Sequence, residues 1–160
     1  MKRTIKAGFL LICLTISTSL LAAGPNKSIG LIAGIPTGIS FKYWMEKGFI
    51  KGPNQAIDIG VGWRLVNNVG VQVKADYVVH KYGLIPVEFG KLPIYYGLGL
   101  RTVITENNDT DLGIRIPVGA NYLFEDEPFG VFVEVAPVLL IVPSTDLHMS
   151  MAIGGRYRFR

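Results

Sequence analysis

Seven charged residues of this chain each stand in the middle of an otherwise apolar segment. Asp58 and Arg115 each lie between two isoleucines, and Glu134 lies between two valines. Successive side chains of a strand point to opposite faces, so we expect each charge to face one way and its apolar neighbours the other. The seven residues, spaced 14 to 25 positions apart, are Lys42, Asp58, Asp76, Arg101, Arg115, Glu134 and Arg156.

The same alternation sorts the flanking residues into two sets. Residues in phase with the charges are mostly charged, polar or small, such as Ser40, Gln72 and Gly99, whereas the out-of-phase residues are apolar. A soluble sheet turns its apolar face inward, but a membrane barrel turns that face to lipid and encloses the polar one. A charge at mid-depth on the lipid face costs about 2–4 kcal/mol. The clean separation therefore predicts a transmembrane β-barrel with a polar, charged interior.

Turn residues divide the pattern into eight segments. They predict an all-β fold, an eight-stranded antiparallel up-and-down transmembrane β-barrel. Residues 81–91 are ambiguous, and one interpretation extends the fourth strand past a bulge to a turn at Gly90-Lys91. Pro117 and Pro137 lack the N–H that a strand ladder uses, so we expect bulges at both. The predicted strands are 28–35, 39–46, 56–65, 71–80, 92–103, 112–123, 130–141 and 148–159.

The N-terminal segment has the pattern of a secretory signal peptide. A basic n-region, an apolar stretch at 7–21 and small residues after it predict a signal over 1–23, followed by one barrel domain over 24–160. The single cysteine, Cys13, lies inside the signal, so the mature chain has no disulfide or thiol chemistry. Three of the 16 basic residues belong to the n-region, which leaves 13 against 12 acidic residues and no basic field for nucleic acid.

The spacing of the seven charges relative to the predicted turns places them side by side on neighbouring strands. Residues that face each other across a hairpin have numbers whose midpoint falls in the turn. For successive members of the seven, the midpoints lie near 50, 67, 88, 108, 124 and 145, in or close to predicted turns. This predicts one belt of charges inside the barrel, in which Asp76 and Glu134 flank and neutralise Arg101 and Arg115. Such a belt would plug a narrow lumen, so we do not expect an open pore.

No constellation of residues predicts catalysis, and we assign no catalytic, cofactor-binding or metal-binding residue. His148 and Ser150 share a strand face, and some outer-membrane lipid A deacylases use a His-x-Ser pair, so a lipid A-modifying enzyme is one alternative. No acid follows the pair, which favours two polar residues at a strand end. His80 and His148 lie on different strands without further ligands, which disfavours a metal site. A soluble lipocalin-like binding barrel is the other alternative, and it requires the two faces to be exchanged.

Three stretches carry a family resemblance: IGLIAGIPTGISFKYW (29–44), KLPIYYGLGLR (91–101) and GIRIPVGANYLFEDEPFGVFVEVAP (113–137). They resemble a family of small outer-membrane β-barrels, related in architecture to OmpA and OmpX, to which no activity is assigned. The last predicted strand also resembles the terminal strands that the barrel-assembly machinery reads, although Arg160 follows the final aromatic residue. The resemblance implies the barrel fold and the bacterial outer membrane.

We therefore expect a monomeric outer-membrane protein that is not an enzyme and has a structural or surface-interaction role. Its expected partners are outer-membrane lipid and the barrel-assembly machinery. A surface partner would be contacted through short outer loops at 35–38, 66–70, 104–111 and 142–147.

Overall fold

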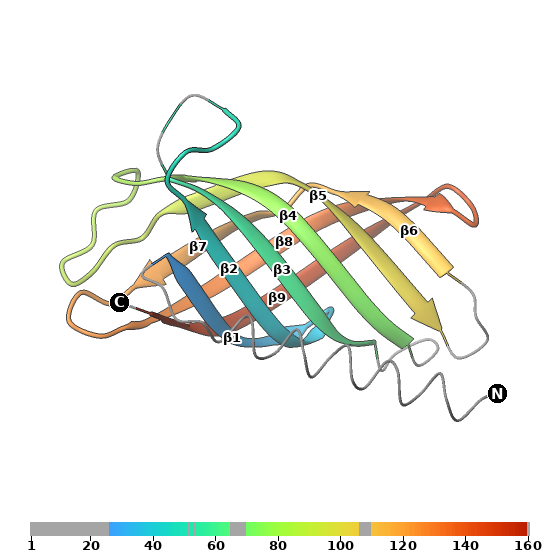
Figure 1. Cartoon of the computed structure of the whole chain (residues 1–160), viewed down its shortest axis with the longest axis horizontal. Coiled ribbons are helices and arrows are strands. Elements are labelled where there is room, and N and C mark those ends of the chain that lie inside the picture. The colour runs from blue at the N-terminus through green and yellow to red at the C-terminus, as the bar shows by residue number, and fades with distance from the viewer. Residues whose placement is uncertain (1–25, 51, 53, 65–69, 106–109, 160) are drawn as a thin grey trace.

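The computed structural model describes residues 26–50, 52, 54–64, 70–105 and 110–159, and the described chain is built from β-strands (Figure 1). The predicted signal peptide, 1–23, lies outside the described residues. Within the described ranges, no helix combines the length and the apolar character that crossing a membrane requires. The strands are β1 (Lys27–Gly34), β2 (Thr37–Met45), β3 (Gln55–Arg64), β4 (Gly70–Lys81), β5 (Ile94–Thr105), β6 (Thr110–Arg115), β7 (Val118–Leu123), β8 (Phe129–Val142) and β9 (Asp146–Arg158).

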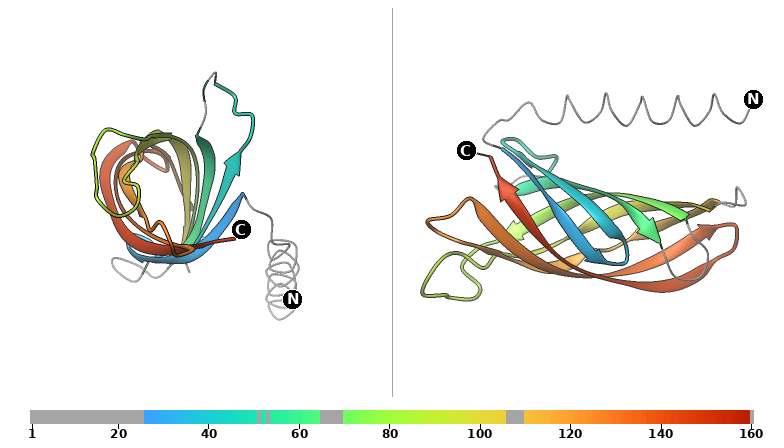
Figure 2. Two further views of the ribbon diagram at one scale, coloured as in Figure 1. Left: turned by 90° about the vertical axis from the view of Figure 1, so that its left-hand side faces the viewer. Right: turned by 90° about the horizontal axis from the view of Figure 1, so that it is seen from below.

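The sheet closes on itself. Strands that follow one another in the chain pair antiparallel, except around the β6–β7 division, and β1 pairs with β9 through seven residue pairs from Ser28–Arg158 to Gly34–Ala152. The end-on view in Figure 2 shows the resulting ring of strands. The arrangement is antiparallel and up-and-down, as the sequence predicts.

The prediction of eight strands is wrong for the described chain, which has nine, because the segment 112–123 is divided into β6 and β7. Both pieces pair with β5 on one side and with β8 on the other, so they occupy one position in the ring. The division falls at Ile116-Pro117, where Pro117 offers no N–H to the ladder. The Ile116 N–H still donates to the Pro137 carbonyl (3.0 Å), and the Gly97 N–H donates to the Pro117 carbonyl (3.0 Å), so the wall continues across the division.

The bulges expected at Pro117 and Pro137 are also wrong. Arg115 pairs with Val138 and Val118 pairs with Val135, so the register is the same on both sides of the two prolines. Each missing N–H leaves a gap in the ladder but does not shift it. The register shift between β6 and β8 lies instead at Leu112-Gly113, away from either proline.

The ring turns its polar face inward. Along β8, every second residue from Gly130 to Leu140 is buried, whereas Val131, Val133 and Val135 are 46, 54 and 38 % exposed. The interior is nevertheless not polar throughout, because apolar residues flank the charges. One such group, Ala56, Val78 and Tyr95, packs together with Trp44.

The two ends of the ring differ. The terminal end holds the start of β1, the end of β9, the described part of the connection between β2 and β3, and the connections 82–93 and 124–128. The opposite end holds connections such as 35–36 and 143–145 (Figure 1). The ambiguous segment 81–91 does not extend β4, which ends at Lys81. It belongs instead to the connection at the terminal end, in which Gly83 and Gly90 adopt positive φ values of 78° and 107°. Part of the predicted outer loops, 65–69 and 106–109, lies outside the described residues.

Candidate functional site

All seven residues of the predicted charge belt are buried inside the ring, with side chains no more than 5 % exposed. Each comes from a different strand, because alternation places every second side chain in the lumen along β2, β3, β4, β5, β6, β8 and β9. Lys74, on the same face of β4 as Asp76, is buried with them. Burial on this scale is tolerated only where the charges pair with one another.

One group of charges is centred on Asp58. Its carboxylate accepts a hydrogen bond from Arg156 Nη2 at 2.6 Å and forms an ion pair with Lys42 Nζ at 3.4 Å. Ser40 links the same partners, because its hydroxyl donates to Asp58 Oδ1 at 3.4 Å and accepts from Arg156 Nε at 2.8 Å. This Asp58 group therefore has two cations for one carboxylate.

A second group is built from Asp76 and Glu134 with two cations between them. Lys74 Nζ lies 2.7 Å from Glu134 Oε1 and 3.5 Å from Asp76 Oδ2. Arg115 lies 2.5 Å from Glu134 Oε1 and 3.2 Å from Asp76 Oδ1. The Tyr95 hydroxyl adds a hydrogen bond to Glu134 Oε2 at 2.9 Å. In this Asp76–Glu134 group each cation contacts both carboxylates.

The ladder pairs only part of the belt as the midpoints predict. Lys42 pairs with Asp58 and Asp58 with Asp76, as expected. The predicted pairing of Asp76 with Arg101 is wrong by two residues, because Arg101 pairs with Lys74. Arg101 likewise pairs with Gly113 and not with Arg115. Lys74 thus takes the place in the Asp76–Glu134 group that the sequence analysis gave to Arg101.

The last two predicted pairings of the belt are wrong by four residues. Arg115 pairs with Val138, and Glu134 pairs with Gly119 and Ala152. Arg115 still reaches Glu134 because strands in a closed sheet are tilted and staggered, so side chains that are not ladder partners meet in the lumen. Arg156, by contrast, is not a ladder partner of Asp58, but its side chain forms an ion pair with Asp58 in the interior.

His80 and three aromatic rings complete the surroundings of the charges. Lys42 Nζ lies 3.2 Å from His80 Nε2, 4.7 Å from the centre of the Tyr95 ring and 5.5 Å from that of Trp44. The Arg156 guanidinium lies 3.7 Å from the centre of the Phe132 ring. Such contacts stabilise cations where they are desolvated. His80 was not predicted to join the belt, although its phase with Lys74 and Asp76 along β4 already points it inward.

His148 and Ser150, the two residues of the alternative enzyme site, contact different partners. His148 Nε2 lies 3.3 Å from Asp146 Oδ2, so the acid that the sequence analysis sought after the pair precedes it. The Ser150 hydroxyl donates to the Ile35 carbonyl at 2.5 Å. A nucleophilic serine requires its hydroxyl to bond the base, and this hydroxyl bonds the backbone. Among the described residues, no three His, Cys, Asp or Glu side chains gather as a metal site.

No protein-family model matches the chain, and no curated protein matches it either. Among solved structures, it is similar to the N-terminal β-barrel domain of Pseudomonas aeruginosa OprF, with a TM-score of 0.57 and 14 % sequence identity over 86 % of this chain and 99 % of that one. The chain therefore has the fold of a β-barrel like that of the OprF domain. This confirms the predicted architecture at the level of the fold.

Proposed function

We propose that the protein is a monomeric bacterial outer-membrane barrel with a closed, ion-paired interior and a structural or surface-interaction role. The observation that carries the proposal is the reversed polarity of its two faces. Outward positions such as Leu98, Val133 and Ile153 are 54 to 60 % exposed, whereas the charges are sealed inside. An apolar surface that continues around the wall exceeds the patches that soluble monomers expose, and it matches a lipid environment.

Aromatic pairs on the outside of the terminal end support this placement. Phe129 and Tyr157 have ring centres 5.3 Å apart, Tyr157 and Phe159 5.4 Å, and Tyr122 and Phe124 4.9 Å. Aromatic side chains are enriched where a membrane protein crosses the headgroup level. The proposed partners are therefore outer-membrane lipid and the assembly machinery that recognises the last strand. A surface partner would contact the connections between strands.

The filled lumen favours a structural role over transport. Eight strand positions enclose a space that side chains fill, and here the ion pairs of the Asp58 and Asp76–Glu134 groups occupy it. A soluble lipocalin-like barrel would require an apolar interior and a charged exterior, the reverse of the arrangement found.

Heat-modifiability on a detergent gel tests the placement, because folded outer-membrane barrels resist unfolding by the detergent until they are heated. We expect unheated and heated samples to differ in mobility, and we expect the folded protein to sediment with reconstituted lipid vesicles. Vesicles that contain the protein should retain small sugars as well as protein-free vesicles do. A protein that stays monomeric in buffer without detergent would overturn the membrane proposal, and rapid sugar release would overturn the closed interior.

A further inference from the structure

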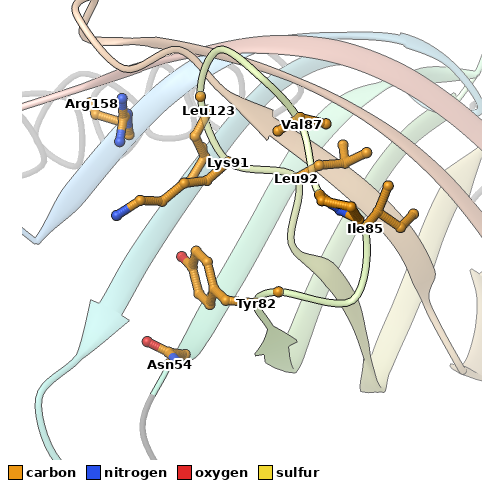
Figure 3. A pocket seen from close by; sticks show the side chains of 11 residues that line it. Asn54, Tyr82, Ile85, Val87, Lys91, Leu92, Leu123 and Arg158 are labelled. Atoms are coloured by element: carbon orange, nitrogen blue, oxygen red, sulfur yellow. The ribbon is translucent and has the colours of Figure 1, made fainter.

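The terminal end of the barrel contains an open pocket of about 620 Å³ under the connection 82–93 (Figure 3). A second pocket of about 460 Å³ adjoins it and shares Tyr82, Leu123 and Arg158 with it. We call the two together the vestibule. Volumes of this size are typical of sites for small organic ligands.

The vestibule has a cationic side. Arg158 and Lys91 line the first pocket with the polar groups of Tyr82 and Asn54, and Lys27 lines the second. Figure 3 shows Lys91 reaching into the space between Tyr82 and Arg158. Among the described residues, no aspartate or glutamate lines either pocket. An arginine and a lysine that converge beside neutral donors are suited to the oxygens of a phosphate.

The opposite side of the first pocket is apolar. Ile85, Val87 and Leu92 line it from the connection 82–93, and Figure 3 shows them grouped apart from Lys91 and Arg158. A ligand that filled the whole pocket would therefore carry a charged head and an apolar chain. Neither inorganic phosphate nor a neutral lipid satisfies both sides.

The cationic side is held in place before any ligand binds. Lys91 and Leu123 exchange two backbone hydrogen bonds, of 2.9 and 2.8 Å, and the Tyr122 hydroxyl donates to the Phe89 carbonyl. Arg158 Nη2 donates to the carbonyls of Phe124 (2.9 Å) and Glu127 (3.0 Å). Gly90 permits this closure, because its φ is 107° and a Cβ there would lie 2.4 Å from the Leu123 carbonyl oxygen. Preorganisation of this kind reduces the entropy lost on binding.

From this geometry we propose that the vestibule binds an anionic phosphate ester that carries an apolar chain, with the phosphate at Lys91 and Arg158 and the chain against Ile85, Val87 and Leu92. The proposal goes beyond the structural role, since it assigns a ligand site at one end of the barrel. The ligand site is defined by the residues that line the vestibule, so it does not depend on which compartment the terminal end faces.

Tryptophan fluorescence offers a direct test. The chain has two tryptophans, and Trp44 lines the second pocket, so a Trp63→Phe background makes Trp44 the sole reporter. This protein, folded in a nonionic detergent, is titrated with dihexanoyl-phosphatidylglycerol, with dihexanoyl-phosphatidylcholine and with inorganic phosphate. We expect saturable binding of the phosphatidylglycerol, at least about tenfold tighter than of either other probe, because only it satisfies both sides of the pocket.

Two variants locate the site. Lys91→Gln should weaken phosphatidylglycerol binding about five- to tenfold, whereas Lys47→Gln, which removes an exposed lysine outside both pocket linings, should leave it unchanged. Val87→Asn should weaken phosphatidylglycerol binding without changing that of inorganic phosphate. Equal affinity for all three probes, or equal loss in the Lys91 and Lys47 variants, would overturn the site. The heat-modifiable band of each sample reports folding separately, so failure of the site and failure of the membrane proposal are distinguishable.

Discussion

The two charge groups inside the barrel both neutralise buried charges by ion pairing, but they differ in composition. The Asp58 group has one carboxylate for Lys42 and Arg156, so the loss of that carboxylate leaves two cations without their shared anion. The Asp76–Glu134 group has two carboxylates, and each of its cations contacts both. From this comparison we expect that redundancy, and not the number of ion pairs, determines how much a single buried charge contributes to stability.

The largest effect is expected for Asp58→Asn, which keeps the side-chain shape and removes the charge. Lys42 and Arg156 would remain buried without their carboxylate, and breaking a buried pair in this way costs about 3–5 kcal/mol. Urea unfolding in lipid vesicles, followed by tryptophan fluorescence, should show a correspondingly lower midpoint. A midpoint like that of the unmodified protein would break the comparison.

Glu134→Leu should come next. It removes the closer carboxylate of Lys74 and Arg115 and the acceptor of the Tyr95 hydroxyl, but Asp76 remains at 3.5 and 3.2 Å. We expect a loss of about 3 kcal/mol, at the lower end of the range for broken buried pairs. The same urea titration measures it, and a loss larger than that of Asp58→Asn would contradict the proposed redundancy.

Asp76→Asn should have a smaller effect than either. Glu134 keeps Lys74 at 2.7 Å and Arg115 at 2.5 Å, so neither cation loses its nearest anion. A loss of about 1–2 kcal/mol is expected, as for a hydrogen-bonded charge whose partners stay satisfied. The Asp76→Asn, Glu134→Leu double variant sharpens the test, because its loss should exceed the sum of the two single losses.

The smallest effect is expected for Lys42→Met, which removes the surplus cation of the Asp58 group. Asp58 keeps Arg156 at 2.6 Å and Ser40, and a methionine fills the space beside Trp44 and Tyr95. We expect a change within about 1 kcal/mol in either direction, because apolar replacement of a buried ion often has little net cost. A loss comparable to that of Asp58→Asn would show that Lys42, and not Arg156, is the main partner of Asp58.

The sequence was sufficient to assign side chains to the inner or the outer face of the barrel, but it was insufficient to predict which interior side chains contact one another. Side chains alternate with a fixed period of two, so Asp58, Arg115 and Glu134 could be assigned to the interior from their neighbours alone. Turn residues located the strands within a few positions. Neither signal, however, contains the stagger of the closed sheet, which determines which interior side chains meet.

Particular errors follow from that limit. The midpoint of the two residue numbers predicts that Arg101 faces Asp76. The register of β4 and β5 differs by two residues from this prediction, so Arg101 faces Lys74, and Lys74 is the cation that contacts Asp76. His80 was weighed as a ligand and not as a neighbour of Lys42, because a contact between β2 and β4 crosses the intervening β3. The division at Pro117 was expected as a bulge, since a missing N–H alone does not reveal whether the ladder shifts or opens.

The pairing of β1 with β9 also constrains how the chain is made. These strands lie at opposite ends of the described sequence, and their seven paired residues form only when both are available. Closure therefore joins positions more than a hundred residues apart, and such distant contacts make folding slow. Until β9 is available for pairing, β1 has an unpaired edge to which a strand of another chain can add.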